Sequence, residues 1–380
     1  MVNYGFLSTY PPTQCGLATF CAALMRHLAD PATGERCGIV PVVDDLPAPH
    51  ARHDTRVRLV NGRPVSTLRA IDALNRFDIL IFQHEYGLYG GLDGEDVLDV
   101  LTAMEIPVVS VLHTVLAAPT PHQRSVLQGV IDASAALVVL SWTAARTLSD
   151  GYLIEPERIH VIPHGAVTPA EPGRSRPDDV PPMILTWGLI GPGKGIEWAI
   201  EALGRLGDLR PTVKYLVAGQ THPKVLAEQG ESYRSSLQQQ AASTGVAGQV
   251  EFDPKYRELG PLTALVRSAD LVLLPYDSTE QATSGVLVEA VAAGRPVVAT
   301  DFPHARELLS GGAGLVVPHR DPAAMAHAIR RVLTEPGLSE SMTARSAELA
   351  PALAWRTIAD GYRKLAKTLL ETKTLDRVAT

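Results

Sequence analysis

The feature that most constrains this chain is a repeated alternation of short apolar runs with stretches of helical periodicity. The runs VNYGFLS, DILIFQ, PVVSVLH and ALVVLS are each followed by an amphipathic stretch, at residues 18–29, 92–104, 122–133 and 143–151. Strands of a parallel sheet are buried on both faces and are therefore apolar throughout, and alternation of such strands with helices is typical of α/β domains. The first part of the chain is predicted to form a parallel sheet with helices on both faces.

The same pattern begins again after a segment without periodicity. Residues 166–182, AVTPAEPGRSRPDDVPP, contain five prolines and are predicted to be an extended linker. After it come the runs PMILTW, TVKYLVAG, DLVLLPY and PVVAT, with helices expected from Lys194, from Glu258 and from Pro322 onward. Because 380 residues are also more than one core usually holds, we predict two doubly wound α/β domains, residues 1–170 and 171–352.

Composition excludes several classes of function. The net charge of −7 favours neither nucleic acid nor an anionic membrane as a partner. Cys15, Cys21 and Cys37 are an odd number without ligand spacing, which argues against a disulfide framework or a zinc site. No apolar run approaches the roughly 18 to 20 residues of a membrane span, and the N-terminus lacks the pattern of a signal peptide. We expect a cytoplasmic protein without a transmembrane segment.

Polar loops follow the predicted strands in both halves. They are TYPPTQCGLATF, QHEYGLYGG, HTVLAAP, GLIGPGKG and PYDSTEQATSG. Ligands of open α/β sheets bind at the carboxyl ends of the strands, so these loops are the candidate binding segments.

One of these loops, GLIGPGKG, carries Lys194 at the start of a predicted helix. Glycines let phosphate oxygens approach the N–H groups of a helix N-terminus, where the helix dipole is positive, and Lys194 adds a full charge. The spacing is that of neither a Walker A motif nor a GxGxxG motif, and a plain strand-to-helix turn is the alternative interpretation.

A carboxylate interrupts the apolar helix in QATSGVLVEAVAAGRPVVAT. Glu289 lies eight residues after Gln281, where the surrounding residues are small and apolar. It either serves a solvated or capping role or binds a ligand.

Together, GPGKG and GVLVEAVAAGRPVVAT resemble the family-4 retaining glycosyltransferases of the GT-B fold, which use nucleotide-sugar donors. The resemblance covers nearly the whole chain, because TYPPTQCGLATF, HTV and IPHG match the N-terminal half of that family. It implies two Rossmann-like domains facing each other across a cleft and a C-terminal helix, residues 353–380, that crosses back to the first domain. It also implies a nucleoside diphosphate sugar as co-substrate, with no other cofactor and no metal.

The resemblance assigns roles to individual residues. Glu289 matches the ribose-binding glutamate, since a carboxylate accepts two hydrogen bonds at once. Lys194 matches the lysine that faces the donor diphosphate, and His113 the histidine that contacts the transferred sugar. The remaining donor-binding positions are Gly16, Gly188, Gly193, Ser284, Gly285 and Val286.

The chain departs from the family pattern at two positions. Gln281 stands where the family usually has a glutamate that contacts sugar hydroxyls. We expect Gln281 to make this contact through its amide, with Glu280 as the alternative. Leu189 stands where the family commonly has a phosphate-binding arginine, and Arg257 or Lys255 could replace that charge.

The N-terminal half is expected to hold the acceptor, with His84, Glu85 and Tyr86 as candidate contacts. Six arginines between residues 52 and 76 could meet an anionic acceptor, although a solvated, salt-bridged face is the interpretation we favour; they are Arg52, Arg56, Arg58, Arg63, Arg69 and Arg76.

The activity implied is retaining transfer of a hexose, such as mannose or glucose, to a carbohydrate, lipid-linked or small-molecule hydroxyl acceptor. Catalysis is expected to involve His113, Lys194 and Gln281, without a protein nucleophile. The alternatives are a GT-B epimerase or phosphorylase, and a catalytically weak subunit that binds sugar nucleotides.

Overall fold

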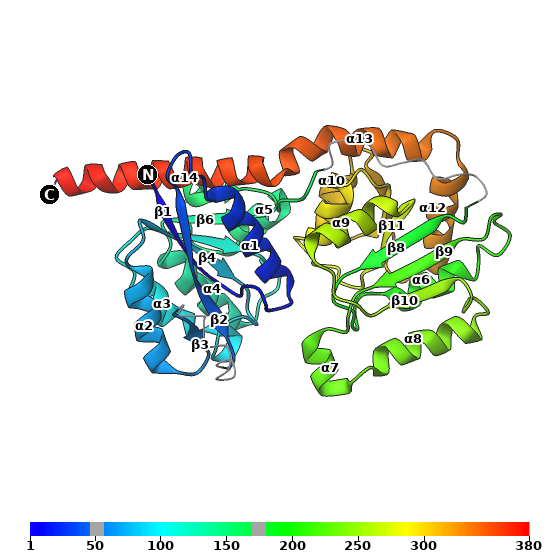
Figure 1. The fold of residues 1–380 in the computed structure, drawn as a ribbon, viewed down its shortest axis with the longest axis horizontal. Coiled ribbons are helices and arrows are strands. Elements are labelled where there is room, and N and C mark those ends of the chain that lie inside the picture. The colour runs from blue at the N-terminus through cyan, green and yellow to red at the C-terminus, as the bar shows by residue number, and fades with distance from the viewer. Residues whose placement is uncertain (46–56, 169–179, 380) are drawn as a thin grey trace. The chain divides into compact units, whose positions relative to one another are not determined.

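The computed structural model describes residues 1–45, 57–168 and 180–379, with side chains described up to residue 373. The chain forms two compact units (Figure 1). Unit 1 comprises residues 1–164 and 355–380, and unit 2 comprises residues 165–354. Each unit is an α/β domain with its own parallel sheet, so the predicted fold class is confirmed.

Unit 1 is built on a sheet whose described strands run in the order β3-β2-β1-β4-β5-β6-β7. The strands are β1 (Asn3–Ser8), β2 (Arg36–Val43), β3 (Leu59–Val60), β4 (Ile79–His84), β5 (Val108–Leu112), β6 (Ala136–Val139) and β7 (Ile159–Val161). The helices are α1 (Gly16–Leu28), α2 (Pro64–Leu74), α3 (Val97–Thr102), α4 (Pro121–Asp132), α5 (Trp142–Gly151) and α14 (Trp355–Ala379), with short 3-10 turns at Leu92–Gly94 and Pro156–Arg158.

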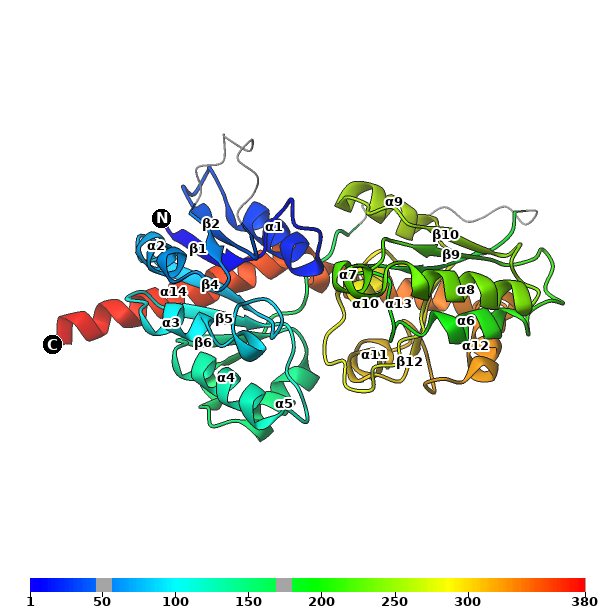
Figure 2. The same cartoon turned by 90° about the horizontal axis from the view of Figure 1, so that it is seen from below.

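The long helix α14 belongs to the core of unit 1. Trp355, Ile358 and Tyr362 are buried against residues of α1 and one face of the sheet. Figures 1 and 2 show α14 running beside α1 along this face. The apolar spacing that the sequence shows after residue 353 is therefore a packing face.

Unit 2 has a sheet whose described strands run in the order β10-β9-β8-β11-β12-β13. These strands are β8 (Met183–Trp187), β9 (Lys214–Ala218), β10 (Val250–Asp253), β11 (Leu271–Leu274), β12 (Val297–Thr300) and β13 (Gly314–Val317). The helices are α6 (Ile196–Leu203), α7 (Pro223–Gln229), α8 (Ser232–Ser243), α9 (Leu259–Ser268), α10 (Gly285–Ala292), α11 (Pro303–Leu309), α12 (Pro322–Thr334) and α13 (Leu338–Leu353).

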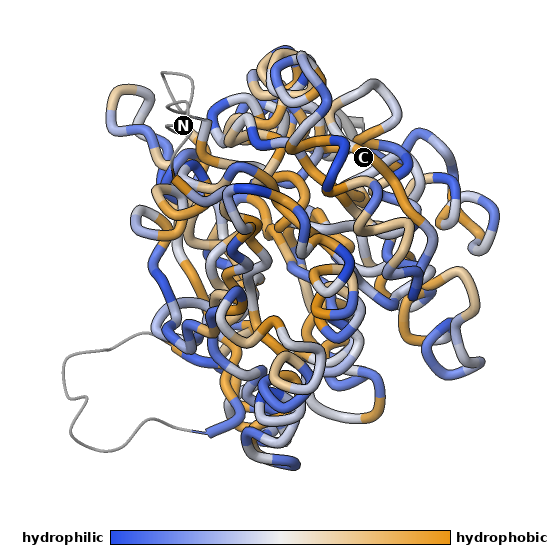
Figure 3. Tube along the Cα trace, turned by 90° about the vertical axis from the view of Figure 1, so that its right-hand side faces the viewer, coloured by the Kyte–Doolittle hydropathy of each residue, from blue (hydrophilic) through white to orange (hydrophobic). Residues whose placement is uncertain are grey.

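Two apolar layers enclose this second sheet. One lies between the sheet and α6, α8 and α12, and the other between the sheet and α9, α10 and α11. Figure 3 shows the hydrophobic strands in the interior and hydrophilic residues in loops and on outer helix faces. This burial of both strand faces explains the continuous apolar runs of the sequence.

The strand order reverses at one point in each sheet. Strand β1 lies between β2 and β4, and β8 lies between β9 and β11. At such a point the loops after the two neighbouring strands leave in opposite directions and open a crevice, which is where ligands of doubly wound sheets bind. The loops after β8 and β11, and those after β1 and β4, are therefore the first places to look for a site.

Two predicted helices differ from the structure. The helix expected from Lys194 begins at Ile196, because Gly195 is left-handed with φ 65°. The helix expected over residues 92–104 is divided into a short turn and α3, since Asp93 and Gly94 both have positive φ.

Candidate functional site

The loop after β8 is held against the loop after β11 in unit 2. The backbone N–H of Asp277 donates to the carbonyl of Gly193 at 3.0 Å, and Trp198 Nε1 donates to Asp277 Oδ1 at 2.9 Å. Gly195 fits between these loops because a Cβ there would lie 1.7 Å from the carbonyl oxygen of Pro275. These contacts fix both loops at the carboxyl edge of the sheet.

Lys194 is placed by this arrangement and lacks an anionic partner. The side chain is partly buried, and its Nζ lies 4.5 Å from the centre of the Tyr276 ring. Burial lowers the pKa of Lys194 from its ordinary value, and no ion pair is recorded for it among the described residues. A desolvated ammonium over an aromatic face gains strongly from an incoming anion.

Glu289 lies on α10, the helix that follows the loop after β11. Burial raises the pKa of its carboxyl to about 7, and the donor that contacts it is Trp187 Nε1, at 3.4 Å from Oε2. It borders a small void together with Leu262 and Thr263 of α9. Glu289 is partly buried, and one long hydrogen bond leaves its carboxylate with acceptor capacity to spare, which favours a ligand-binding role over a solvated helix face.

The N-terminus of α10 contributes backbone donors. Ser284 is its N-cap: Oγ accepts from Leu287 N at 3.2 Å, and the backbone N–H of Ser284 donates to His304 Nδ1 at 2.9 Å. Burial lowers the pKa of His304 to about 4, so its imidazole is neutral and accepts this bond. Gly285 and Val286 begin the helix, where N–H groups have no intrahelical partner.

The side chains of Gln281 and Glu280 differ in burial and in hydrogen bonding. Gln281 is partly buried and its Nε2 donates to the carbonyl of Thr283 at 3.1 Å, whereas Glu280 is exposed. Either side chain is in the loop after β11, and the choice of Gln281 as the sugar contact stays a prediction.

Arg257 is paired within its own segment. It forms a salt bridge with Asp253 at the carboxyl end of β10, which is two strands from β8. Lys255 is exposed. Sequence reasoning also missed His222: its backbone N–H donates to the carbonyl of Ile190 at 2.8 Å, and burial, followed by the charges of Lys224 and Lys194, lowers the pKa of its ring. His222 therefore lies beside the glycine loop, although its sequence context, THP, carries no recognisable signal.

In unit 1, the loop after β1 leads into α1 at Gly16. Cys15 is the N-cap, with its Sγ accepting from Ala18 N at 3.4 Å and lying 3.2 Å from Thr9 Oγ1. Gly16 is exposed, and an added Cβ would meet nothing within 4 Å. Local packing in unit 1 therefore does not require a glycine at this position.

His113 follows β5 and is held by three contacts. Its Nε2 lies 2.6 Å from Gln83 Oε1, its backbone N–H donates to the carbonyl of His84 at 3.2 Å, and its ring meets Phe20 edge-on at 4.9 Å. Burial, followed by the charges of His164 and His84, lowers its pKa to about 3. His113 is thus neutral at physiological pH.

The candidate acceptor residues after β4 differ in accessibility. His84 is 1% exposed, and burial lowers its pKa to about 4. Glu85 and Tyr86 are partly exposed, and Glu85 accepts from Thr114 Oγ1 at 2.6 Å and from the N–H of Tyr86 at 3.1 Å. Contact with an acceptor through Glu85 and Tyr86 stays a prediction, while the ring of His84 is covered by unit 1 itself.

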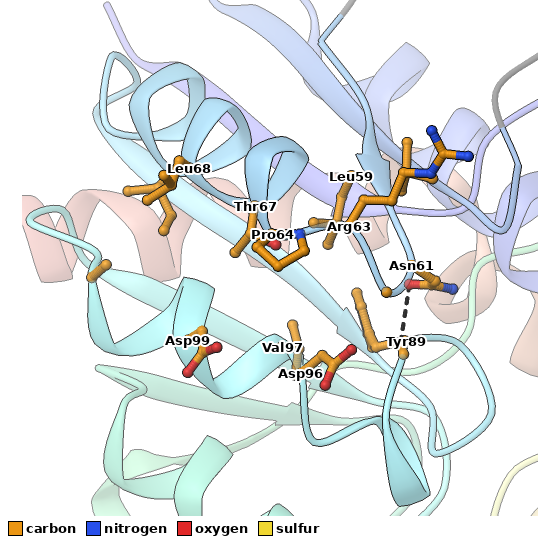
Figure 4. Close-up of a pocket in the computed structure, with 15 residues that line it drawn as sticks. Leu59, Asn61, Arg63, Pro64, Thr67, Leu68, Tyr89, Asp96, Val97 and Asp99 are labelled. Carbon is orange, nitrogen blue, oxygen red and sulfur yellow. Dashed lines mark hydrogen bonds between the residues drawn. The ribbon is translucent and has the colours of Figure 1, made fainter.

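A cavity of about 590 Å³ lies next to this loop, between α2 and α3 (Figure 4). Tyr89 and Gly90 line it, and Asn61 Oδ1 accepts from Gly90 N at 3.0 Å. Arg63, one of the six clustered arginines, lies on the α2 side and Asp96 on the α3 side. Sequence reasoning missed this cavity because its lining residues look like ordinary packing; Arg52 and Arg56 lie outside the described residues.

No group of three or more His, Cys, Asp or Glu side chains in the described part of the chain is arranged to hold a metal ion. No described helix is both long and apolar enough to cross a membrane.

Comparison with known families matches both halves of the chain. Residues 181–335 match the model described as glycosyl transferases group 1, and residues 16–168 match the model described as glycosyltransferase family 4.

Curated relatives share less than a third of the residues. A D-inositol 3-phosphate glycosyltransferase of Acidothermus cellulolyticus is 29% identical over 280 residues, which cover 67% of this chain and 60% of that protein. The corresponding enzyme of Jonesia denitrificans is 26% identical over 395 residues, covering 86% of this chain and 90% of that protein.

Solved structures share the fold. The sucrose-phosphate synthase of Thermosynechococcus elongatus has a TM-score of 0.76 at 17% identity, covering 98% of this chain and 100% of that one. Anabaena HepE in complex with UDP-glucose has a TM-score of 0.71 at 18% identity, covering 97% of this chain and 99% of that one.

Proposed function

The chain belongs to the family-4 glycosyltransferases of the GT-B fold, and from this premise we propose that it transfers a hexose from a nucleoside diphosphate sugar to a hydroxyl acceptor with retention of configuration. The observation that carries the proposal is the state of two side chains near the switch point of unit 2, Lys194 in the loop after β8 and Glu289 on α10. Lys194 has no anionic partner among the described residues, and Glu289 is a partly buried carboxylate with unused acceptor capacity.

The diphosphate of the donor takes the place opposite Lys194. Its negative charge favours the protonated lysine, which burial disfavours in the free protein. The N–H groups at the start of α10 add a positive dipole end. As the sugar leaves, charge builds on the diphosphate, and these groups stabilise it without a metal.

The ribose is held by Glu289. Its two hydroxyls donate to the carboxylate, which ionises because hydrogen bonds to the charged form lower its pKa. Gln281 contacts the transferred sugar, and the neutral ring of His113 contributes a further hydrogen bond to it. No protein nucleophile takes part: the departing phosphate accepts the acceptor's proton on the face where the new bond forms.

The donor is identified by thermal shift with UDP-, GDP- and ADP-sugars. A ligand at 100 times its Kd stabilises the folded protein by about 2.7 kcal/mol, which gives a measurable rise in Tm. UDP-glucose is the first donor to test because HepE was solved with it, and inositol phosphate is the first acceptor because curated relatives are D-inositol 3-phosphate glycosyltransferases. Release of nucleoside diphosphate that depends on the acceptor supports transfer.

Other outcomes support the alternatives. A catalytically weak binding subunit would be stabilised by a donor without turnover, and the departures at Gln281 and Leu189 are the reason to consider it. An epimerase would convert the donor alone, and a phosphorylase would require inorganic phosphate. If no sugar nucleotide raises Tm, the donor-site assignment is wrong. Addition of EDTA tests metal independence, for which unchanged turnover is expected.

A further inference from the structure

Three polar residues of unit 1 lie on one face of its sheet. Leu7 of β1 pairs with Phe82 of β4, so Ser8 follows opposite Gln83, and Gln83 pairs with Val111 of β5, two residues before His113. Residues alternate between the faces of a sheet, so Ser8, Gln83 and His113 share the face that packs against α1 and α14. Gln83 lies on the strand between the other two residues.

The environment of Gln83 is costly for an amide. Its side chain is 0% exposed, and its Nε2 has no partner among the described residues. Burying an amide with an unpaired N–H costs free energy, so a merely structural role would be better filled by an apolar side chain.

The contact that Gln83 does make is to His113. Gln83 Oε1 lies 2.6 Å from His113 Nε2, and both residues are placed by strands whose backbones are directly bonded. The Phe20 ring packs edge-on against His113, which restricts rotation of the imidazole. The charged or titratable neighbours that influence His113 are His84 and His164.

A neutral imidazole carries its proton on one nitrogen only. Burial lowers the pKa of His113 to about 3, which keeps the ring neutral through the physiological range. Gln83 Oε1 can only accept a hydrogen bond, so His113 Nε2 is the protonated donor and Nδ1 keeps its lone pair.

We propose that Gln83 is a positioning residue that holds His113 in the Nε2–H tautomer, so that Nδ1 accepts a hydrogen bond from a hydroxyl of the transferred sugar. The tautomer follows from unit 1 alone, and its use toward a sugar rests on the proposed function. Reversal of the Gln83 amide would place Nε2–H of Gln83 against the ring and turn His113 Nδ1 into a donor. In the first arrangement His113 Nδ1 accepts a hydrogen bond from the sugar hydroxyl, and in the second it donates one to the hydroxyl oxygen.

The direct test is the tautomer of His113 in the unliganded wild-type protein. The full chain is labelled with ring-15N histidine, and long-range 1H–15N spectra are recorded between pH 5.5 and 8. The resonances of His113 are identified by their loss in His113→Gln. We expect a protonated Nε2 and an unprotonated Nδ1 throughout this range; a protonated Nδ1 overturns the proposal.

Two variants test the role of Gln83. Gln83→Leu is expected to release the ring into a mixture of tautomers, whereas Gln83→Glu keeps Nε2–H and raises the pKa of His113 into the range studied. Gln128→Leu, on the distant helix α4, is the matched control and should leave the His113 spectrum unchanged. If the His113 spectrum of Gln83→Leu is identical to that of the wild type, the proposal is contradicted. If a variant does not fold, the tautomer seen in the wild-type spectrum alone decides the proposal.

Kinetics separate positioning from general damage. Gln83→Leu is expected to lower kcat/KM for the donor at least tenfold while changing the Kd of the free nucleoside diphosphate less than twofold. Gln83→Glu should add an acid limb to the pH profile of kcat/KM. An equal loss in nucleoside diphosphate binding means that Gln83 is structural only. The spectra need no donor, so the two proposals can fail independently. Absence of turnover would refute the proposed function, while the tautomer of His113 would still be decided by the spectra.

Discussion

The raised pKa of Glu289 makes donor affinity depend on pH in a predictable direction. The carboxyl of the free protein has a pKa of about 7, and ribose hydroxyls donate to the ionised form. Binding must therefore remove a proton from Glu289 below pH 7, so affinity falls as the pH falls. From pH 8 to pH 5.5 the ionised fraction drops about 30-fold, which corresponds to roughly 2 kcal/mol of binding free energy.

The measurement is isothermal titration calorimetry with the nucleotide sugar from the thermal-shift panel. A nucleotide sugar is used because its diphosphate is esterified at both ends and does not titrate in this range. Wild-type Kd is expected to rise about 30-fold from pH 8 to pH 5.5. In Glu289→Gln the Kd at pH 8 should be about tenfold weaker, since the bond to a charged acceptor is lost, and its remaining pH dependence should be small.

The matched control is Glu340→Gln, an exposed carboxylate in the first turn of α13. This variant should retain the full wild-type pH dependence. Either of two results would refute the assignment of Glu289 to the ribose. One is a wild-type Kd that does not change with pH, and the other is a Glu289→Gln variant whose Kd still changes about 30-fold.

Three further predictions concern the same crevice. Lys194→Ala should lower kcat more than tenfold with little change in Tm, because a cation without an anionic partner among the described residues contributes more to stabilising diphosphate charge than to folding. A variant that retains a tenth of wild-type kcat or more contradicts this assignment of Lys194. Gln281→Ala should cost about 1 to 3 kcal/mol in kcat/KM and spare nucleoside diphosphate binding, whereas a loss confined to Glu280→Ala would show that the wrong neighbour was chosen. Gly195→Ala should lower the free energy of unfolding in denaturant by about 2 kcal/mol or more, since φ is 65° and the new Cβ overlaps the Pro275 carbonyl. Gly193→Ala is the control: it has open space around it and should lower the free energy of unfolding by only about 1 kcal/mol. Equal losses in the two variants would exclude the steric explanation.

The fold could be predicted where periodicity is strong. Strands such as β4 and β6 are buried on both faces and appear as uninterrupted apolar runs. The residues of β2, RCGIVPVV, were not singled out because they contain polar, glycine and proline positions. Helices α7 and α8 carry little sequence signal, since most of their side chains face solvent and few apolar positions mark a buried face.

The candidate site could be predicted only as far as its motifs extend. Lys194 and Glu289 lie in recognisable segments, the loop after β8 and helix α10. The contact of Gln83 with His113 depends on the register of two strands, which a single sequence does not reveal.

The cavity beside Tyr89 escaped prediction for a related reason. It is formed between α2 and α3, whose apolar residues have the same spacing whether they pack against each other or leave a space. Helix length, tilt and side-chain size decide between these outcomes, and none of them is visible in the periodicity.

The central claim is retaining transfer by this chain, and the anomeric configuration of the product tests it most directly. Purified protein is incubated with the donor selected by thermal shift and an acceptor, and the anomeric proton of the product is observed by NMR. The account predicts acceptor-dependent release of nucleoside diphosphate and a glycoside with the donor's own configuration, both lost in Lys194→Ala. An inverted product, or no product from a donor that demonstrably binds, would contradict it.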